Sequence, residues 1–352
     1  MAIVLAVDAM GGDHGVHITV PAALRFLDET ADVNIVLVGD RDSIYKQLGD
    51  KLSSYSDRIE VAHATQVVGM DEAPQSAMRT KRDSSMRVAI NLIKETKANA
   101  VVSAGNTGAL MAISRYVLRT MDGIDRPAIA KLMPTVKGEV CVLDLGANVE
   151  CAPEHLLQFG VMGSQLMRGV TGKLTPSVGV LNIGSEDIKG NETVKKAAEL
   201  LKKTNLNFYG NVEGDDIFKG VVDVVVTDGF TGNVSLKTTE GVAKMISFFL
   251  KEEFTRSWWT KIIALLSFPV LKRLKQRVDP SKYNGAVLLG LNGLVVKSHG
   301  GADVDGFYYA LKQAHHEVEA NVIGLLQDYL QQNQAVLSDT EELIEFSDLK
   351  TL

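Results

Sequence analysis

Short runs of β-branched residues alternate with longer stretches of helical spacing along most of this chain, and few folds satisfy that pattern. Such alternation is typical of βαβ units that build a mostly parallel sheet. The runs consist almost entirely of Val, Ile and Leu, so we expect helices on both faces of the sheet. The sequence therefore predicts a three-layer, Rossmann-like α/β fold. The expected strands and helices, in chain order, are Ile3–Val7, Ile18–Leu27, Val33–Val38, Ser43–Leu48, Ala100–Ser103, Thr107–Thr120, Val140–Leu143, a helix opening at Pro153, Val178–Leu181, a helix near Asn191, Val221–Thr227 and a helix near Gly232.

The chain shows no Ser- or Pro-rich linker and no break in composition. We therefore expect residues 1–335 to form one α/β domain, followed by an acidic tail over residues 336–352. The first twelve residues, MAIVLAVDAMGG, are too short an apolar run for a signal peptide and lack a basic start. No apolar stretch is long enough for a transmembrane helix. A cytoplasmic protein is expected.

The net charge, the Cys and His residues and the missing glycine motifs argue against several functional classes. The net charge of −6 provides no basic field for nucleic acid, so no such partner is expected. Cys141 and Cys151 match no zinc spacing, and Cys151 is more plausibly a bystander than a nucleophile. His14 and His17 could share a helical face, yet no carboxylate partner is evident. Dinucleotide and P-loop glycine motifs are absent, and we predict neither a metal nor an organic cofactor.

Gly- and Asn-rich turns follow four of the expected strands. Ligands in open α/β sheets bind beyond the carboxyl ends of strands, and N–H groups at helix starts attract anions. Each turn alone could be a tight connection, but the four together predict an anion site. The turns are Asp8–Asp13, Ser103–Gly108, Asp144–Asn148 and Asp228–Asn233.

Residues 242–278 differ from the rest and predict a protruding amphipathic helical hairpin. Apolar residues recur at helical spacing, Phe268-Pro269 interrupts them, and a second amphipathic stretch begins at Leu271. Six basic residues and no acidic ones lie from Arg256 to Arg277. Packing in a dimer is the alternative to membrane binding; we expect the helices to dimerise and the Trp258–Leu271 end to touch an anionic membrane. The expected membrane contacts are Trp258, Trp259, Ile262, Leu265, Leu266 and Phe268.

Seven ordered motifs, spread over nearly the whole chain, resemble the bacterial phosphate acyltransferases of the PlsX family. They are VDAMGGDHG (Val7–Gly15), the run with RTKRDSSM (Met70–Met86), SAGNTGALM (Ser103–Met111), LDLGANVEC (Leu143–Cys151), LNIGSEDIKGNE (Leu181–Glu192), DGFTGNVSLKTTEG (Asp228–Gly241) and SHGGAD (Ser298–Asp303). The resemblance implies that a fatty acyl group moves from an acyl carrier protein thioester to inorganic phosphate. It also implies a fold similar to phosphotransacetylases and isocitrate-dehydrogenase-like enzymes, and a homodimer without metal or cofactor.

This reaction suits a chain without a catalytic triad. Phosphate is largely a dianion near neutral pH and a thiolate leaves readily, so positioning and donors for the oxyanion suffice. The resemblance and the residue types suggest roles. Catalytic roles are assigned to Asp228, Asn233, Lys189 and His299; phosphate or oxyanion binding to Gly11, Gly12, Asn106, Thr107, Gly108, Asn148 and Asn191; and orienting roles to Asp8, Asp13, His14 and Asp144.

A basic cluster between two of the motifs could bind the acidic carrier protein. Its members are Arg79, Lys81, Arg82 and Arg87. A merely solvated basic surface is the alternative. Three other functions compete with the main one: a phosphotransacetylase-like enzyme using acyl-CoA, a nicotinamide-dependent dehydrogenase, and a membrane-recruited scaffold. The missing dinucleotide motif disfavours the second, and polar residues at several strand ends disfavour the third.

Overall fold

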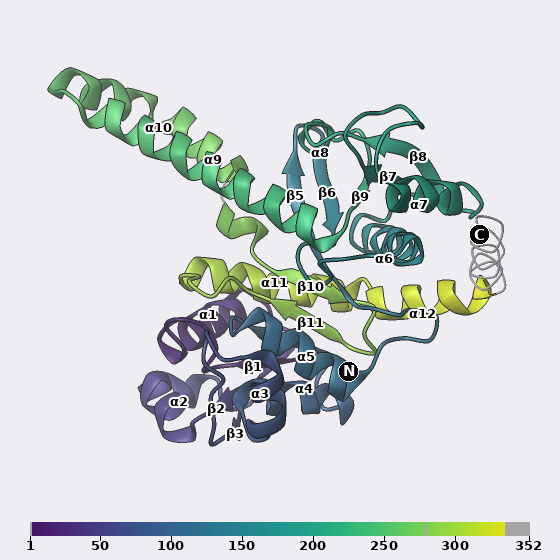
Figure 1. Cartoon of the computed structure of the whole chain (residues 1–352). Helices are drawn as coiled ribbons and strands as arrows, with labels where there is room; N and C mark the ends of the chain where they lie inside the picture. Colours follow the sequence, from purple (N-terminus) through teal and green to yellow (C-terminus); the bar gives the residue numbers. More distant parts are fainter. Residues whose placement is uncertain (1, 279, 335–352) are drawn as a thin grey trace.

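The computed structural model describes residues 2–278 and 280–334, which form a mixed α/β structure around one sheet (Figure 1). Described strands number eleven, in the order β3-β2-β1-β4-β11-β10-β5-β6-β9-β7-β8. Their bounds are β1 (Ile3–Asp8), β2 (Val33–Gly39), β3 (Ile59–His63), β4 (Ala100–Ser103), β5 (Ala128–Thr135), β6 (Gly138–Leu143), β7 (Ser177–Leu181), β8 (Asn207–Val212), β9 (Val224–Val226), β10 (Ala286–Leu289) and β11 (Leu294–Lys297).

The sheet contains two parallel blocks that run in opposite directions. The first block is β3-β2-β1-β4-β11 and the second is β6-β9-β7-β8. The steps from β11 to β10, β10 to β5 and β5 to β6 are all antiparallel, and an odd number of reversals turns the second block around. The prediction of a mostly parallel α/β sheet is confirmed.

Helices cover both faces of the sheet because successive strand residues point to opposite sides. In β1, Leu5 and Val7 belong to a core cluster with α1 and α11, whereas Ala6 belongs to a cluster with α4 and α5. The α-helices are α1 (Val16–Glu29), α2 (Arg41–Leu48), α3 (Pro74–Thr80), α4 (Ser85–Lys94), α5 (Thr107–Leu118), α6 (Pro153–Thr171), α7 (Glu192–Lys202), α8 (Asp216–Lys219), α9 (Gly229–Thr255), α10 (Trp258–Val278), α11 (Val304–Glu319) and α12 (Val322–Gln332). Short 3-10 helices are η1 (Gly49–Ser54) and η2 (Pro280–Tyr283).

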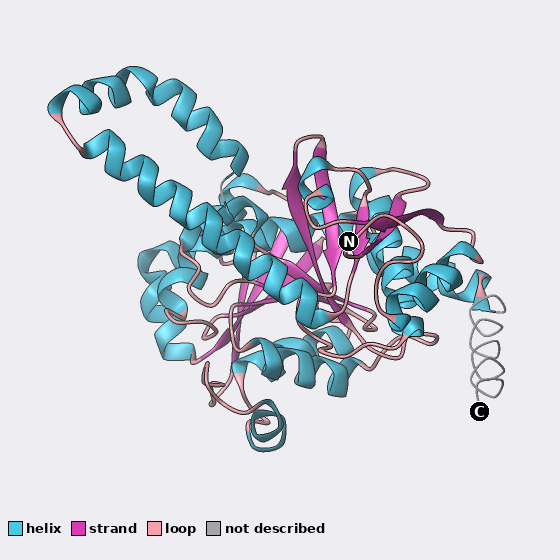
Figure 2. Ribbon diagram, turned by 45° about the horizontal axis from the view of Figure 1, so that its top comes forward, coloured by secondary structure: helices cyan, strands magenta, loops and turns pink. Residues whose placement is uncertain are grey.

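The helical hairpin consists of α9 and α10 and extends away from the rest of the molecule (Figure 2). Its turn was predicted at Phe268-Pro269, and this prediction was wrong. The turn lies at Arg256-Ser257, where Ser257 Oγ accepts a hydrogen bond from the Thr260 N–H (3.2 Å) and so caps α10. Pro269 lies inside α10. A proline within a helix removes one backbone hydrogen bond and bends it, which agrees with the curvature of α10 in Figure 2.

Further expectations concern membrane-spanning helices, the C-terminal tail and the domain bounds. None of the helices that the structure describes combines the length and apolarity needed to cross a membrane. The acidic tail predicted for residues 336–352 lies outside the described residues. The assignment of residues 1–335 to one domain stays a prediction.

Candidate active site

The turns of the first block pack against one another at the carboxyl ends of β1, β4 and β11. A Cβ atom on Gly11 would lie 2.6 Å from Asp8 Oδ2, and one on Gly12 would lie 2.8 Å from the Gly300 carbonyl oxygen. Gly12 also has a φ of 86°, which favours glycine. The Asp13 N–H donates to the Gly300 carbonyl (3.0 Å). Gly11 and Gly12 thus permit close packing of the turn. This packing explains both glycines without the anion binding that was predicted for them.

Asp8 lies beneath these turns with its carboxylate almost fully buried. Its Oδ2 accepts a hydrogen bond from Ser103 Oγ (2.6 Å), whereas Oδ1 has no partner among the described residues. Burial raises the pKa of this carboxyl group, and the hydrogen bonds and nearby Lys297 oppose that rise. Asp8 therefore lies close enough to Lys297 to oppose the fall of the lysine pKa, and its orienting role stays a prediction.

In the second block, the buried Asp144 organises the turn after β6. Its Oδ1 accepts from the N–H groups of Ile129 (2.9 Å) and Ala147 (3.1 Å), and its Oδ2 accepts from the Asn148 N–H (2.6 Å). The Asn148 amide donates to the Pro127 carbonyl (2.8 Å) and to Asp144 Oδ2 (3.0 Å). Asn148 is therefore engaged in holding the turn and does not reach the pocket described below.

Replacing Asp144 by Ala should lower the free energy of unfolding by about 3 kcal/mol, because buried N–H donors would lose their acceptor. Urea denaturation of the folded protein measures this change. Asp122→Ala is the control, since Asp122 is exposed and its loss should cost no more than about 0.5 kcal/mol. Equal midpoints for the two variants would show that Asp144 does not support the turn.

Three polar residues with predicted site roles, two for anion binding and one for catalysis, act as helix N-caps. The side chains of Asn106, Asn191 and Asp228 accept hydrogen bonds from Ala109, Val194 and Thr231 N–H groups, at 3.0, 2.9 and 2.8 Å. The Asn106 amide also donates to the Met70 (2.8 Å) and Glu72 (3.0 Å) carbonyls. These side chains therefore fix the starts of α5, α7 and α9.

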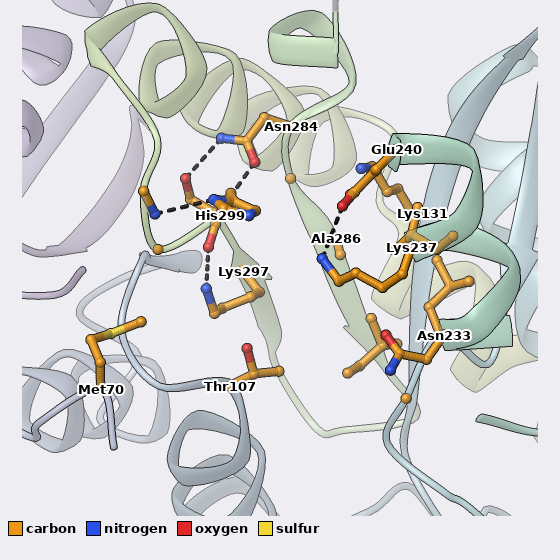
Figure 3. Close-up of a pocket in the computed structure, with 18 of the residues that line it drawn as sticks. Met70, Thr107, Lys131, Asn233, Lys237, Glu240, Asn284, Ala286, Lys297 and His299 are labelled. Carbon is orange, nitrogen blue, oxygen red and sulfur yellow. Dashed lines mark hydrogen bonds and ion pairs between the residues drawn. The ribbon is translucent and has the colours of Figure 1, made fainter. Parts of the chain in front are cut away.

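A cavity of about 500 Å³ lies between the two blocks and receives residues from both (Figure 3). From the first block come Thr107 at the start of α5 and the residues that follow β11. From the second come the turn after β6 and one face of α9. Its lining consists of Asp13, Met70, Thr107, Ile129, Lys131, Leu145, Gly146, Asn233, Leu236, Lys237, Glu240, Asn284, Gly285, Ala286, Lys297, Ser298, His299, Gly300 and Gly301.

Lys297 is the most deeply placed cation of this pocket. It is 8% exposed, and its Nζ donates to the Ala104 carbonyl (3.2 Å) and to the Ser298 carbonyl. Burial lowers its pKa to about 8, against the opposing influence of Asp8 and Asp13. An ammonium group held by backbone carbonyls in this position attracts an anion that enters from the cavity.

Two more lysines face the pocket from the other side. Lys131 lies on β5, and burial lowers the pKa of its amine. Within the described part of the chain, its Nζ makes neither a hydrogen bond nor an ion pair. Lys237 on α9 pairs with Glu240 (2.9 Å), one turn further along the helix. Because Lys131 is half-buried and has no carboxylate at contact distance, it is a second candidate to hold an anion.

His299 is held in place by hydrogen bonds on both its ring and its backbone. The ring Nδ1 accepts from the Gly301 N–H (3.1 Å), and the backbone N–H of His299 donates to Asn284 Oδ1 (2.9 Å). Burial and then Lys237 lower the pKa of the imidazole, which favours the neutral ring. Since Nδ1 is the acceptor, the proton of the neutral ring is assigned to Nε2. His299 can therefore donate a hydrogen bond from Nε2.

Asn233 and Thr107 complete the polar lining. Asn233 lies four residues before Lys237 on α9, so the two share one helical face. Its amide makes no hydrogen bond to the part of the chain that the structure describes, and it points into the pocket in Figure 3. Thr107 presents its hydroxyl from the first turn of α5. Both groups are free to contact a ligand.

The pocket thus brings together some, but not all, of the predicted site residues. Asp13, Thr107, Asn233 and His299 line it. Lys189 is exposed in the loop after β7, and His14 is exposed after β1; neither lines this cavity. Their roles, like that of Gly108 beside Thr107, stay predictions.

Sequence reasoning missed the three lysines of the pocket. Lys237 follows Asn233 by one helical turn inside a motif already singled out, and Lys297 immediately precedes the SHGGAD motif. Lys131 interrupts the otherwise apolar start of β5. A charged residue inside a buried strand is unusual, so the sequence alone could have indicated Lys131 as a site residue.

The structure separates the basic cluster of residues 79–87 into side chains with and without longer-range hydrogen bonds. Lys81 Nζ donates to the Val67 carbonyl (3.2 Å), and Arg87 donates to the Met78 carbonyl (2.9 Å). Arg79 and Arg82 are exposed. Only these two are therefore well placed to contact a partner without giving up a longer-range hydrogen bond.

Comparison with known proteins gives a consistent result. A family model described as fatty acid synthesis protein matches residues 3–325. Phosphate acyltransferase of Chromobacterium violaceum is 63% identical over 328 residues, which covers 93% of this chain and 95% of the relative. Phosphate acyltransferase of Cupriavidus taiwanensis is 56% identical and covers 92% of this chain and 90% of its own length.

Solved structures of similar fold include two phosphotransacetylases. One from Streptococcus pyogenes has a TM-score of 0.61 at 16% identity, covering 92% of this chain and 94% of that one. EutD phosphotransacetylase from Staphylococcus aureus has a TM-score of 0.57 at 16% identity, covering 91% and 94%. At these identities the likeness concerns the fold alone.

Proposed function

The chain belongs to the fatty acid synthesis protein family and is an acyltransferase, which confirms the resemblance to PlsX enzymes, and we propose that it transfers a fatty acyl group from acyl carrier protein to inorganic phosphate. The observation that carries the proposal is a cavity of about 500 Å³ whose lining includes the two lysines Lys131 and Lys297. The product would be an acyl phosphate for phospholipid synthesis.

In the proposed reaction, phosphate occupies the space between the two lysines. One phosphate oxygen attacks the thioester carbonyl carbon, the C–O bond forms, and the C–S bond breaks. The cations hold the attacking anion, and Asn233 Nδ2 donates to the oxygen of the carbonyl as negative charge develops there. His299 Nε2 donates a hydrogen bond to the departing sulfur, which leaves as a thiolate and then takes up a proton from solvent. The phosphate dianion is nucleophile enough to need no general base.

The acyl donor is the finer part of the proposal, and a substrate comparison tests it. With phosphate fixed, kcat/KM should be higher for palmitoyl–acyl carrier protein than for palmitoyl-CoA or acetyl-CoA. The readout is formation of acyl phosphate, trapped as the hydroxamate. A preference for short acyl-CoA would favour the phosphotransacetylase-like alternative instead.

The exposed Arg79 and Arg82 are proposed to attract the acidic carrier protein. Arg79→Glu with Arg82→Glu should raise KM for acyl carrier protein roughly tenfold at low salt, and less at high salt, because salt screens exposed charges. KM for phosphate should not change. The same reversal at the exposed Lys46 and Lys51 is the control. An unchanged KM for the carrier protein at low salt would remove this cluster from the account.

The hairpin is proposed to dock on anionic membrane. Leu265 and Leu266 on α10 are 74% and 76% exposed, beside stacked Trp258 and Trp259. Leu265→Glu with Leu266→Glu should abolish flotation with vesicles of anionic phospholipid, because charge would replace the apolar contact. The control is Leu174→Glu with Val136→Glu, at residues that are 79% and 74% exposed elsewhere. Equal flotation of both double variants would contradict the proposal.

A homodimer is proposed as well, from the apolar surface of α9. Six of its large apolar side chains are 43–63% exposed: Val242, Met245, Ile246, Phe248, Phe249 and Leu250. A continuous apolar surface of this kind is typical of a protein interface. In the hairpin, α9 would then make the dimer contact and α10 the membrane contact.

A further inference from the structure

A second cavity, of about 280 Å³, lies beside the pocket, between β5, β6, α8 and the first turns of α9. Buried apolar side chains form its floor: Met133 from β5, Val142 from β6 and Ile217 from α8. Val234 and Leu236 of α9 add apolar walls. We refer to this cavity as the α8–α9 groove.

Two of the three side-chain hydroxyl groups that line this groove, those of Ser235 and Thr239, are already engaged. Ser235 Oγ donates to the Thr231 carbonyl (2.8 Å), and Thr239 Oγ1 donates to the Ser235 carbonyl (2.8 Å). Both hydrogen bonds lie within α9, so these side chains do not require water or a polar ligand. The groove therefore presents a mainly apolar surface although it opens to solvent.

The groove adjoins the pocket, and the two cavities share part of their walls. Leu145 and Leu236 line both the lysine-lined space and the apolar one. If the carbonyl of an acyl thioester lay in the pocket, its alkyl chain would have an apolar groove directly beside it. An acyl thioester has this same division, with a polar reacting end and an apolar chain.

A further cavity that adjoins the pocket is chemically different. It has a volume of about 340 Å³ and is lined by charged side chains that include Lys244, Glu240 and Asp303. An alkyl chain placed there would strip water from these charges without replacing their hydrogen bonds. This contrast favours the α8–α9 groove for the chain.

We propose that the α8–α9 groove binds the fatty acyl chain of the donor, with the thioester carbonyl at the Leu145–Leu236 boundary. The inference rests on the proposed function and adds the site that selects chain length. Each methylene group that enters the groove should improve binding roughly fourfold. Long-chain donors should therefore be preferred until the chain extends beyond the apolar walls.

The test fills the groove and measures chain-length preference. Val234 on α9 is 49% exposed and lines the groove, whereas Leu174 is 79% exposed and lies outside it. Val234→Trp should lower kcat/KM for palmitoyl–acyl carrier protein at least tenfold and change kcat/KM for butyryl–acyl carrier protein less than twofold. Leu174→Trp is the control and should leave the ratio of the two kcat/KM values unchanged. Thr238→Trp, at a second groove position, should repeat the shift, which guards against a local folding defect in the first variant.

Failure of this inference differs from failure of the proposed function. If the wild type forms acyl phosphate but Val234→Trp and Thr238→Trp keep its palmitoyl-to-butyryl ratio, the groove does not hold the chain. If those variants instead change the sedimentation of the protein at an unchanged ratio, a second copy covers the groove and the inference is likewise overturned. If the wild type forms no acyl phosphate from either donor, the proposed function itself fails.

Discussion

Lys297→Met should lower kcat/KM for phosphate by about 1,000-fold, the upper range for loss of one preorganised charged donor. Lys297 is buried at the carboxyl end of β11, and its Nζ is held by the Ala104 and Ser298 carbonyls. Methionine preserves the shape and removes the charge, so the protein should remain folded with an unchanged circular dichroism spectrum. A variant that is folded and fully active would show that phosphate does not bind at this lysine.

The pH dependence adds a second measurement on the same residue. Burial lowers the pKa of Lys297 to about 8, so in the free enzyme the amine is charged below that pH and neutral above it. Wild-type kcat/KM for phosphate should therefore fall as the pH rises through about 8. Lys297→Arg keeps its charge at higher pH and should lose this alkaline fall, even if its activity is lower. If kcat/KM for phosphate fell equally in both enzymes above pH 8, the titrating group would be one other than Lys297.

Asn233→Ala should lower kcat by about 100-fold, because a donor to the developing oxyanion is removed. The Asn233 side chain is exposed in the pocket and makes no hydrogen bond to the described residues, so stability should hardly change. Thermal unfolding checks this point.

A second replacement at this position, Asn233→Asp, separates two roles of the side chain. If Asn233 acts as a donor, Asn233→Asp should lower kcat at least as much as Asn233→Ala, since the carboxylate offers no N–H and repels phosphate. If the carbonyl oxygen of Asn233 were the functional group, Asn233→Asp would retain much of the activity, and the oxyanion role would be refuted.

Much of the fold could be predicted because local pattern and tertiary structure agree. β4 and the start of α6 at Pro153 lie where the sequence predicts them. The strands β10 and β11, which pair antiparallel with each other, were missed because each has only four residues. These two strands, with β5, reverse the second block and create the space for the pocket. Sequence periodicity contains no information on that reversal.

The candidate site was harder to predict, because one residue type suits two purposes. Asn106, Asn191 and Asp228 follow strands and precede helices, where a side-chain oxygen can cap a helix. The same position suits a residue that binds an anion beside the helix start, and spacing alone does not separate the two. The cations show the opposite problem: Lys131 on β5 and Lys297 on β11 are far apart in sequence, and only β10 separates their strands in the folded sheet.

The hairpin illustrates a competition between two local signals. Pro269 favoured a break, whereas Ser257 and Thr260 have the spacing of a helix cap. The cap defined the turn because a proline in an exposed helix costs one hydrogen bond and a bend, and the helix can continue beyond it. The Trp258-Trp259 pair therefore lies next to the turn.

The central claim is that inorganic phosphate is the nucleophile, held between Lys131 and Lys297. The most direct measurement incubates the protein with palmitoyl–acyl carrier protein and oxygen-isotope-labelled phosphate, then follows carrier-protein thiol and acyl phosphate together by mass spectrometry. We expect thiol to appear only when phosphate is present, in equal amount to palmitoyl phosphate that keeps every labelled oxygen. Thiol release at the same rate without phosphate, or with palmitate as the sole acyl product, would contradict the account.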